Sequence, residues 1–261
     1  DLYDWSVNNI PQFWETTLDY SDIVYSGKYD RVIENMNMEP GAKWFPGLTL
    51  NFAENLLKFR DDKTAIISKI ENHPIRKISY QDLFIEVEKL AAALRELGVH
   101  RGDRVAGFLP NIPEAIIAML ATASIGAIWS SSSPDFGIKS VTDRFSQIEP
   151  KIIFSASAYI YNGKTFSSIE KLQEIIKQLP TIEKVIIVDY LKTKPDYAKI
   201  PNSINYTTLL SNDPDPIIFE QVPFDHPLYI LYTSGTTGLP KSIVHGTGGT
   251  LIQHKKEFLL F

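Results

Sequence analysis

The residues best suited to chemistry, by their types and spacing, are Thr233 to Lys241, which directly follow the apolar run Leu228 to Tyr232. Phosphate oxygens need several short donors at close range, and hydroxyl side chains, glycine backbone amides and a lysine ammonium supply them. The segment therefore predicts a phosphate-binding loop suspended from the end of a buried strand. The predicted phosphate ligands are Thr233, Ser234, Gly235, Thr236, Thr237, Gly238 and Lys241.

Two alternatives to a phosphate-binding loop carry less weight. A Walker A motif places its lysine immediately after the last glycine and opens a helix, whereas here Leu239 and Pro240 intervene and Ser242 to Val244 suggest a strand. An ordinary turn also uses Ser, Thr, Gly and Pro, but it does not require four hydroxyl residues, two glycines and a lysine within nine positions. We therefore favour phosphate binding over a kinase-like P-loop or a ligand-free turn.

The same string resembles the signature of the adenylate-forming enzymes, a family that includes acyl-CoA synthetases, luciferases and peptide-synthetase adenylation domains. The family pattern Ser-Gly-Thr-Thr-Gly-X-Pro-Lys is present intact from Ser234 to Lys241. The resemblance implies that the loop holds the β- and γ-phosphates of ATP, with Mg²⁺, while a substrate carboxylate attacks the α-phosphorus. It makes Lys241 and Thr237 the expected catalytic residues. The five histidines are scattered, so no metal ligand is predicted within the chain.

Further strings are similar to the branch of this family that joins acetate or acetoacetate to coenzyme A. They are Lys43 to Leu57, Ser133 to Gly137, Arg144-Phe145, Gln147 to Lys151, Val244 to Gly249 and His254 to Glu257. All but the first favour acetoacetate. The resemblance implies ligation of acetoacetate to coenzyme A through an acyl-adenylate, with AMP and pyrophosphate as the other products. Acetate or propionate as the substrate stays open, as does a nucleotide-binding module without catalysis.

A candidate contact for coenzyme A lies in Tyr161 to Lys164, where the acetate-activating relatives carry an arginine-containing stretch that contacts a phosphate of coenzyme A. Tyrosine and lysine stand here in place of two arginines, which leaves Lys164 as the candidate. A solvated surface lysine is the alternative. No catalytic triad is assigned, because the implied reaction needs no protein nucleophile and Ser130 to Ser133 lacks a glycine elbow.

Composition favours a soluble, globular, cytoplasmic enzyme, and the resemblance implies that its partners are small-molecule substrates. The 26 basic and 31 acidic residues give a formal net charge of -5, which argues against a nucleic-acid or anionic-membrane partner. The absence of cysteine fits a reducing compartment and excludes structural disulfides. Residues 1–20 carry charges rather than an apolar run, so no signal peptide is expected, and no stretch of about 18 apolar residues predicts a membrane span.

Strand-like and helical runs alternate along the chain and must position these motifs. Strands are predicted at 64–70, 76–79, 104–109, 127–130, 151–155 and 184–189, and helices at 80–97, 113–124 and 167–179. Another predicted helix is capped by Ser133 or Asp135 and ends at Ile148. This order predicts an α/β fold with a mainly parallel sheet layered with helices. By resemblance, it is the N-terminal portion of the large domain of an adenylate-forming enzyme.

Two regions are expected. Residues 1–60 are rich in aromatic side chains, which we expect to be buried against the main body. Residues 61–261 are expected to form the α/β portion of the ATP-binding domain, with the Pro-rich stretch 191–227 as a surface excursion. The resemblance also implies sequence beyond Phe261, including an adenine-binding segment and a mobile small domain. The 261-residue chain alone is therefore expected to be inactive.

Overall fold

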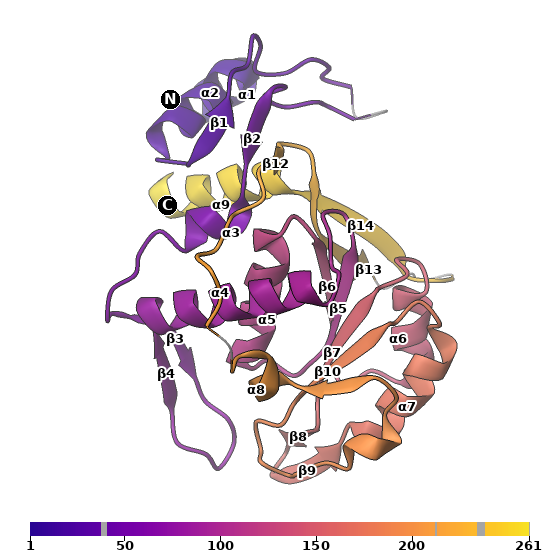
Figure 1. Ribbon diagram of the computed structural model, residues 1–261. Coiled ribbons are helices and arrows are strands. Elements are labelled where there is room, and N and C mark those ends of the chain that lie inside the picture. Colours follow the sequence, from indigo (N-terminus) through magenta and orange to yellow (C-terminus); the bar gives the residue numbers. More distant parts are fainter. Residues whose placement is uncertain (38–40, 212, 234–237, 261) are drawn as a thin grey trace.

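The computed structural model describes residues 1–37, 41–211, 213–233 and 238–260, and a seven-stranded sheet forms the centre of the molecule (Figure 1). In spatial order its strands are β11 (Ser203–Asn205), β10 (Lys184–Val188), β7 (Ile152–Ala156), β5 (Arg104–Phe108), β6 (Ile128–Ser132), β13 (Pro227–Thr233) and β14 (Lys241–Gly246). All neighbours run parallel except β13 and β14, which are antiparallel. The predicted α/β fold with a mainly parallel sheet is confirmed.

Helices cover both faces of this sheet. Helices α4 (Tyr80–Glu96) and α5 (Pro113–Ser124) lie on one face, and α6 (Ile138–Phe145) and α7 (Ile169–Gln178) lie on the other (Figure 1). Successive strand residues alternate between the faces, as expected for a pleated strand. In β7, Ile152 and Phe154 join the core beneath α4 and α5, whereas Ile153 joins the core beneath α6 and α7. The sheet is therefore buried on both sides, which accounts for its apolar strands.

Local sequence explains where the confirmed elements begin. The side chain of Ser79 accepts a hydrogen bond from the Asp82 amide at 3.0 Å, which caps α4 at its predicted start. Pro113 occupies the first turn of α5, where its missing N–H costs nothing. The predicted strands 64–70 and 76–79 are also present, as β3 (Thr64–Ser68) and β4 (Arg76–Ser79), which pair as an antiparallel hairpin before α4.

One predicted helix is wrong at both ends. The structure begins α6 at Ile138, after Gly137, rather than at a cap on Ser133 or Asp135. The Ser133 hydroxyl donates to the Asp135 carboxylate at 3.0 Å, and the Asp135 amide donates to the Ser133 oxygen at 3.3 Å, so both predicted caps serve a local turn instead. The helix ends at Phe145, and Glu149 adopts a φ of 48°, so the chain has left the helical conformation before Pro150.

The Pro-rich stretch 191–227 contributes short elements to two sheets. It contains the 3₁₀ turn η1 (Tyr197–Lys199), strand β11, helix α8 (Tyr206–Leu209) and strand β12 (Val222–Pro223). Strand β11 extends the central sheet next to β10, and β12 pairs with β2 (Leu48–Leu50), which in turn pairs with β1 (Tyr25–Gly27).

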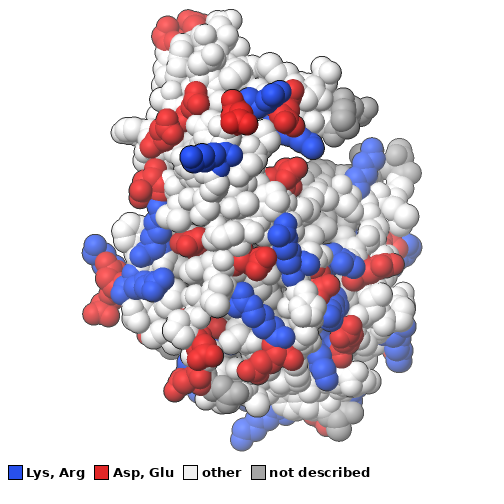
Figure 2. All heavy atoms as spheres, turned by 45° about the horizontal axis from the view of Figure 1, so that its top comes forward, with Lys and Arg blue, Asp and Glu red and all other residues white. Residues whose placement is uncertain are grey.

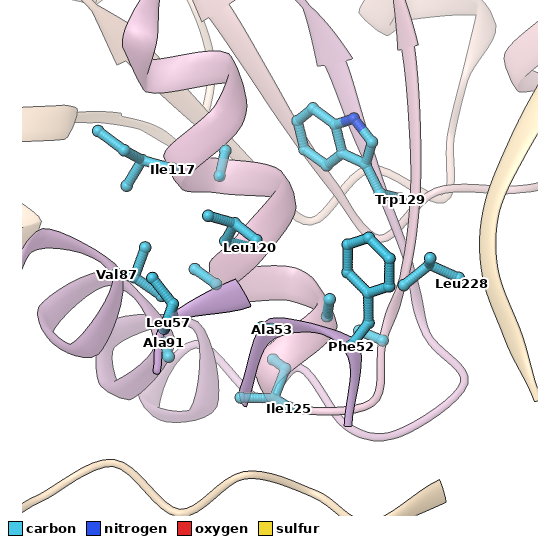
Figure 3. Packing of buried hydrophobic residues seen from close by; sticks show 14 of the residues in the cluster. Phe52, Ala53, Leu57, Val87, Ala91, Ile117, Leu120, Ile125, Trp129 and Leu228 are labelled. Carbon is cyan, nitrogen blue, oxygen red and sulfur yellow. The ribbon is translucent and has the colours of Figure 1, made fainter. Parts of the chain in front are cut away.

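The N-terminal residues form helices α1 (Leu2–Asn8), α2 (Ile10–Tyr20) and α3 (Phe52–Leu56), which lie near the last helix, α9 (Thr247–Leu260), in Figure 1. Aromatic rings connect the two ends of the chain, because Phe45 lies 5.0 Å from Phe224 and Phe52 lies 6.2 Å from His254 between ring centroids. Figure 3 shows the α3 side chains packed among those of α4, α5 and β6. The division into regions 1–60 and 61–261 stays a prediction.

Within the string Lys43 to Leu57, one residue has a clear structural role. The side-chain oxygen of Asn51 caps α3 by accepting from the Glu54 amide at 3.1 Å. Its amide nitrogen donates to the backbone oxygens of Ala123 at 2.9 Å and Glu220 at 2.8 Å. Buried Asn51 therefore joins α3, the end of α5 and the segment before β12. None of the described helices is long and apolar enough to cross a membrane.

Candidate active site

The predicted phosphate loop connects β13 to β14 at the carboxyl end of β13. Thr233 is the last residue of β13 and Lys241 is the first residue of β14, and the two are direct partners across the antiparallel ladder. Both are exposed, as is Gly238. Ser234, Gly235, Thr236 and Thr237 lie outside the described residues. The structure therefore brings together the two ends of the predicted loop at the carboxyl end of β13, and α/β proteins bind ligands outside the carboxyl ends of their strands.

Strand β13 is fixed in the sheet by its buried side chains and by its neighbour β6. Leu228 and Ile230 are buried in the cores on opposite faces of the sheet. The buried hydroxyl of Ser130 in β6 donates to the Ile230 backbone oxygen at 2.8 Å. The Ser130 side chain thus serves the pairing of β6 with β13.

The carboxyl end of α6 contacts both limbs of the loop. On the limb that enters the loop, the Tyr232 hydroxyl donates to the Arg144 backbone oxygen at 2.8 Å. On the returning limb, the Gln147 amide donates to the Pro240 backbone oxygen at 3.0 Å, and the Ser242 hydroxyl donates to the Gln147 side-chain oxygen at 2.7 Å. The sequence places Arg144 and Gln147 in strings similar to a known family, but it does not indicate these contacts.

Two cations stand close to the loop. The Arg144 guanidinium lies 4.9 Å from the centroid of the Phe136 ring and 5.8 Å from that of Tyr232. The exposed Lys241 ammonium forms no ion pair with any described residue, so it can interact with an anionic ligand. Burial raises the pKa of the Tyr232 phenol, although Ser130 and Arg144 oppose this shift, so the hydroxyl stays a hydrogen-bond donor at neutral pH.

Over the described residues, no group of three or more His, Cys, Asp or Glu side chains could hold a metal ion. Figure 2 shows acidic and basic side chains interspersed over the face in view, without a large region of one sign. Such a face offers no basic stripe of the kind that binds nucleic acid.

Lys164 lies in a β-hairpin that was not predicted from the sequence. Strands β8 (Ala158–Tyr161) and β9 (Lys164–Ser167) form a hairpin, with Tyr161 and Lys164 paired on either side of the turn. Asn162 and Gly163 have φ values of 49° and 73°, the combination of a two-residue hairpin turn that favours the sequence Asn-Gly. That sequence signal could have predicted the hairpin.

The tip of this hairpin is bound to another hairpin rather than to the phosphate loop. The amides of Asn162 and Gly163 donate to the Glu71 carboxylate, at 3.2 and 2.6 Å. Lys164 is exposed, and the β8–β9 hairpin lies in Figure 1 at the bottom of the view, away from the β13–β14 pair. The structure therefore does not bring Lys164 together with Thr233 and Lys241.

Comparisons with known proteins relate the whole chain to one group. The family described as AMP-binding enzyme matches residues 52–257, and the family described as acetyl-coenzyme A synthetase N-terminus matches residues 1–56. Acetoacetyl-CoA synthetase of Macaca fascicularis is 49% identical over 269 residues, which cover 100% of this chain and 40% of that relative. Malonamoyl-CoA synthetase vrtB of Penicillium aethiopicum is 43% identical over 274 residues, covering 100% of this chain and 38% of that relative.

A solved structure shows the same fold. Acetoacetyl-CoA synthetase from Streptomyces lividans matches with a TM-score of 0.92 and 44% sequence identity, covering 98% of this chain and 39% of that chain. The chain thus spans about 40% of the length of the curated relatives and of the solved structure that it matches.

Proposed function

The chain belongs to the AMP-binding enzyme family, and we propose that the protein uses ATP to join acetoacetate to coenzyme A through an acyl-adenylate. The observation that carries this proposal is the pairing of Thr233 with Lys241 at the sheet edge, at the two ends of a segment with the family signature. The names and similarity of the relatives support the reaction type.

The proposed reaction has two steps. An acetoacetate carboxylate oxygen attacks the α-phosphorus of ATP, the bond to the β-phosphate bridging oxygen breaks, and pyrophosphate leaves. The coenzyme A thiolate then attacks the acyl carbon, and AMP leaves with the oxygen that came from the carboxylate. The first step needs positioning and charge stabilisation more than covalent help from the protein.

The loop residues supply that positioning in this proposal. Hydroxyls and backbone amides of Thr233 to Gly238 hold the β- and γ-phosphates, and the Lys241 ammonium offsets negative charge that builds on the departing pyrophosphate. Lys241 and Thr237 are the proposed catalytic residues. Mg²⁺ bound to ATP would neutralise part of the triphosphate charge, and the hard phosphate oxygens are ligands it prefers.

Coenzyme A binding is proposed to involve Lys164, through an ion pair with a phosphate of that substrate. Its exposed position on the β8–β9 hairpin leaves the ammonium accessible to such a ligand. This contact serves the second step alone in this proposal, because Lys164 belongs to the β8–β9 hairpin, which lies away from the β13–β14 pair in Figure 1.

Acetoacetate is the proposed acyl substrate because the names of both acetoacetate-activating relatives agree with the strings around the loop. Malonamate is a second candidate, since a relative named malonamoyl-CoA synthetase is 43% identical to the chain. A cytoplasmic location is proposed from the absence of cysteine, and partners other than small molecules are not expected from the net charge of -5.

The experiment that tests the proposal is pyrophosphate release by the full gene product with ATP and acetoacetate, malonamate, acetate or propionate. We expect release with acetoacetate above the others, and loss of release in Lys241→Ala. Lys77→Ala is the matched control, because Lys77 is also an exposed strand lysine but lies in β4.

Lys164→Ala separates the two steps. It should leave acetoacetate-dependent pyrophosphate release unchanged and raise the KM for coenzyme A. If no acid drives pyrophosphate release, the ligase proposal fails and the chain is at most a nucleotide-binding module.

A further inference from the structure

Gln147, two residues beyond the carboxyl end of α6, contacts the residues on both sides of Lys241. The Gln147 amide nitrogen donates to the Asp143 backbone oxygen at 2.6 Å, within its own helical region, and to the Pro240 backbone oxygen at 3.0 Å. Its side-chain oxygen accepts from the Ser242 hydroxyl at 2.7 Å. Pro240 and Ser242 are the immediate neighbours of Lys241, so Gln147 holds a backbone oxygen on one side of the lysine and a side-chain hydroxyl on the other.

The lysine needs this support because its own strand offers little. Lys241 is the first residue of β14, and among the described strands β14 pairs only with β13, at the edge of the sheet. Residues 241–244 are exposed, so no buried side chain anchors this part of the strand. An edge strand with an exposed start is the part of a sheet that opens most easily.

The other limb of the loop is held by the same helix end. Tyr232, one residue before Thr233, donates to the Arg144 backbone oxygen at 2.8 Å. Arg144 in turn donates to the Ser140 backbone oxygen at 2.6 Å, which keeps its guanidinium on α6. Both limbs of the loop are therefore hydrogen-bonded to residues 143–147. The distance between the two limbs depends on the position of this one segment.

We propose that Gln147 is a positioning residue of the phosphate loop, which sets the direction of the Lys241 ammonium by fixing the chain on both sides of it. The inference rests on the proposed function, because it gives Gln147 a role in pyrophosphate release. Gln147 acts through the backbone of the limb that carries Lys241, and a small displacement of a group that stabilises departing charge reduces the rate steeply.

The first test measures the support itself, without reference to activity. Amide hydrogen exchange of residues 241–246 is compared in the wild-type protein, Gln147→Ala and Gln178→Ala. Gln178 is the matched control, because it is also an exposed glutamine at a helix end but, among the described residues, its amide donates within α7, to the Glu174 backbone oxygen at 3.2 Å. We expect exchange in 241–246 to rise at least about fivefold in Gln147→Ala and to stay unchanged in Gln178→Ala.

The second test measures the consequence for the reaction. In Gln147→Ala, kcat for acetoacetate-dependent pyrophosphate release should fall about tenfold, while the KM for acetoacetate stays within about twofold, because a displaced phosphate-binding group affects the charge-building step most. Gln147→Glu should be impaired as strongly as the alanine variant. It keeps an acceptor for Ser242 but loses the donor to Pro240 and places a negative charge beside Lys241.

A double-mutant cycle assigns the effect to the observed contact. If Gln147 acts partly through Ser242, then Ser242→Ala should cost kcat less in the Gln147→Ala background than in the wild type. Additive losses would mean that the two residues act independently and would contradict the coupling through this hydrogen bond.

The outcomes separate this inference from the proposed function. Unchanged exchange at 241–246 in Gln147→Ala overturns the inference, whatever the activity. Raised exchange with unchanged kcat also overturns it, because Gln147 is then only a structural contact. If the wild-type protein releases no pyrophosphate with any acid although exchange responds to Gln147→Ala, the proposed function is wrong, and the positioning role is withdrawn with it.

Discussion

Replacing Gly248 with alanine tests how tightly α9 is seated on the segment before β13. An alanine Cβ at this position would lie 2.3 to 2.5 Å from three atoms of the Phe224 ring, well inside van der Waals contact. The ring cannot turn aside freely, because Phe224 is only 6% exposed and lies 5.0 Å from the Phe45 ring. The Gly248 amide also donates to the Phe224 backbone oxygen at 2.8 Å, which holds α9 against the segment before β13.

The expected loss follows from two opposing terms. Overpacking a buried site costs about 1–3 kcal/mol. The exchange of glycine for alanine returns roughly 0.4–1 kcal/mol, because the unfolded chain loses conformational freedom and Gly248 does not require a positive φ. The net loss in the free energy of unfolding therefore lies between about 0 and 2.6 kcal/mol, with a centre of about 1.3 kcal/mol, which corresponds to a fall in Tm of roughly 3–5 °C for a chain of this size.

The neighbouring glycine supplies the matched control. Gly249 occupies the same turn of α9, is exposed and has no atom within 4 Å of the Cβ position. Gly249→Ala should therefore gain up to about 1 kcal/mol. Urea unfolding of both variants measures the difference. If Gly248→Ala is as stable as Gly249→Ala, then Phe224 yields without cost and the account of a tight α9 contact is refuted.

Three further predictions concern buried polar groups and the hairpin. Arg76→Ala should cost roughly 3 kcal/mol in urea unfolding, because it leaves the 6% exposed Glu114 carboxylate without its ion-pair partner; a loss below about 1 kcal/mol would contradict this. Burial lowers the pKa of His226, whose ring also bonds the Gly126 backbone oxygen at 2.8 Å. The contribution of neutral His226 to the free energy of unfolding is therefore present above the unfolded pKa of about 6.5 and is lost as pH falls through the folded pKa. Between about pH 8 and 5, the wild type should lose more of its free energy of unfolding than His226→Gln. Parallel plots of unfolding free energy against pH would exclude this. Gly163→Ala should cost about 1–2 kcal/mol in urea unfolding, because Gly163 has a φ of 73°, and an unchanged midpoint would show that the hairpin turn tolerates a side chain.

Local signals in the sequence were enough to predict much of the fold. Helix α4 was predictable because a capping residue, Ser79, coincides with the start of a helical apolar repeat. The parallel sheet followed from the alternation of strands and helices. The β8–β9 hairpin was missed although Asn162-Gly163 signals it, because its strands are short and β9 is exposed throughout. The start of α6 was misplaced because Ser133 and Asp135 bond to each other instead of capping.

The candidate site was predictable only in its loop. Thr233 and Lys241 belong to one continuous motif, and their pairing across the ladder agrees with a loop between two strands. Gln147 carries no such signal, because its bond to Ser242 joins residues 95 positions apart in the chain. An exposed glutamine near a helix end is ordinary in sequence, and only the tertiary arrangement of α6 against β14 distinguishes it from Gln178.

The central claim is that a carboxylate oxygen of acetoacetate attacks the α-phosphorus of ATP, and oxygen labelling tests it most directly. The full gene product is incubated with ATP, coenzyme A and acetoacetate whose carboxylate carries ¹⁸O, and the nucleotide and phosphate products are analysed by mass spectrometry. The account predicts one ¹⁸O in AMP, none in pyrophosphate and a requirement for Lys241. Label in inorganic phosphate with ADP as the nucleotide product, or unlabelled AMP, would contradict it.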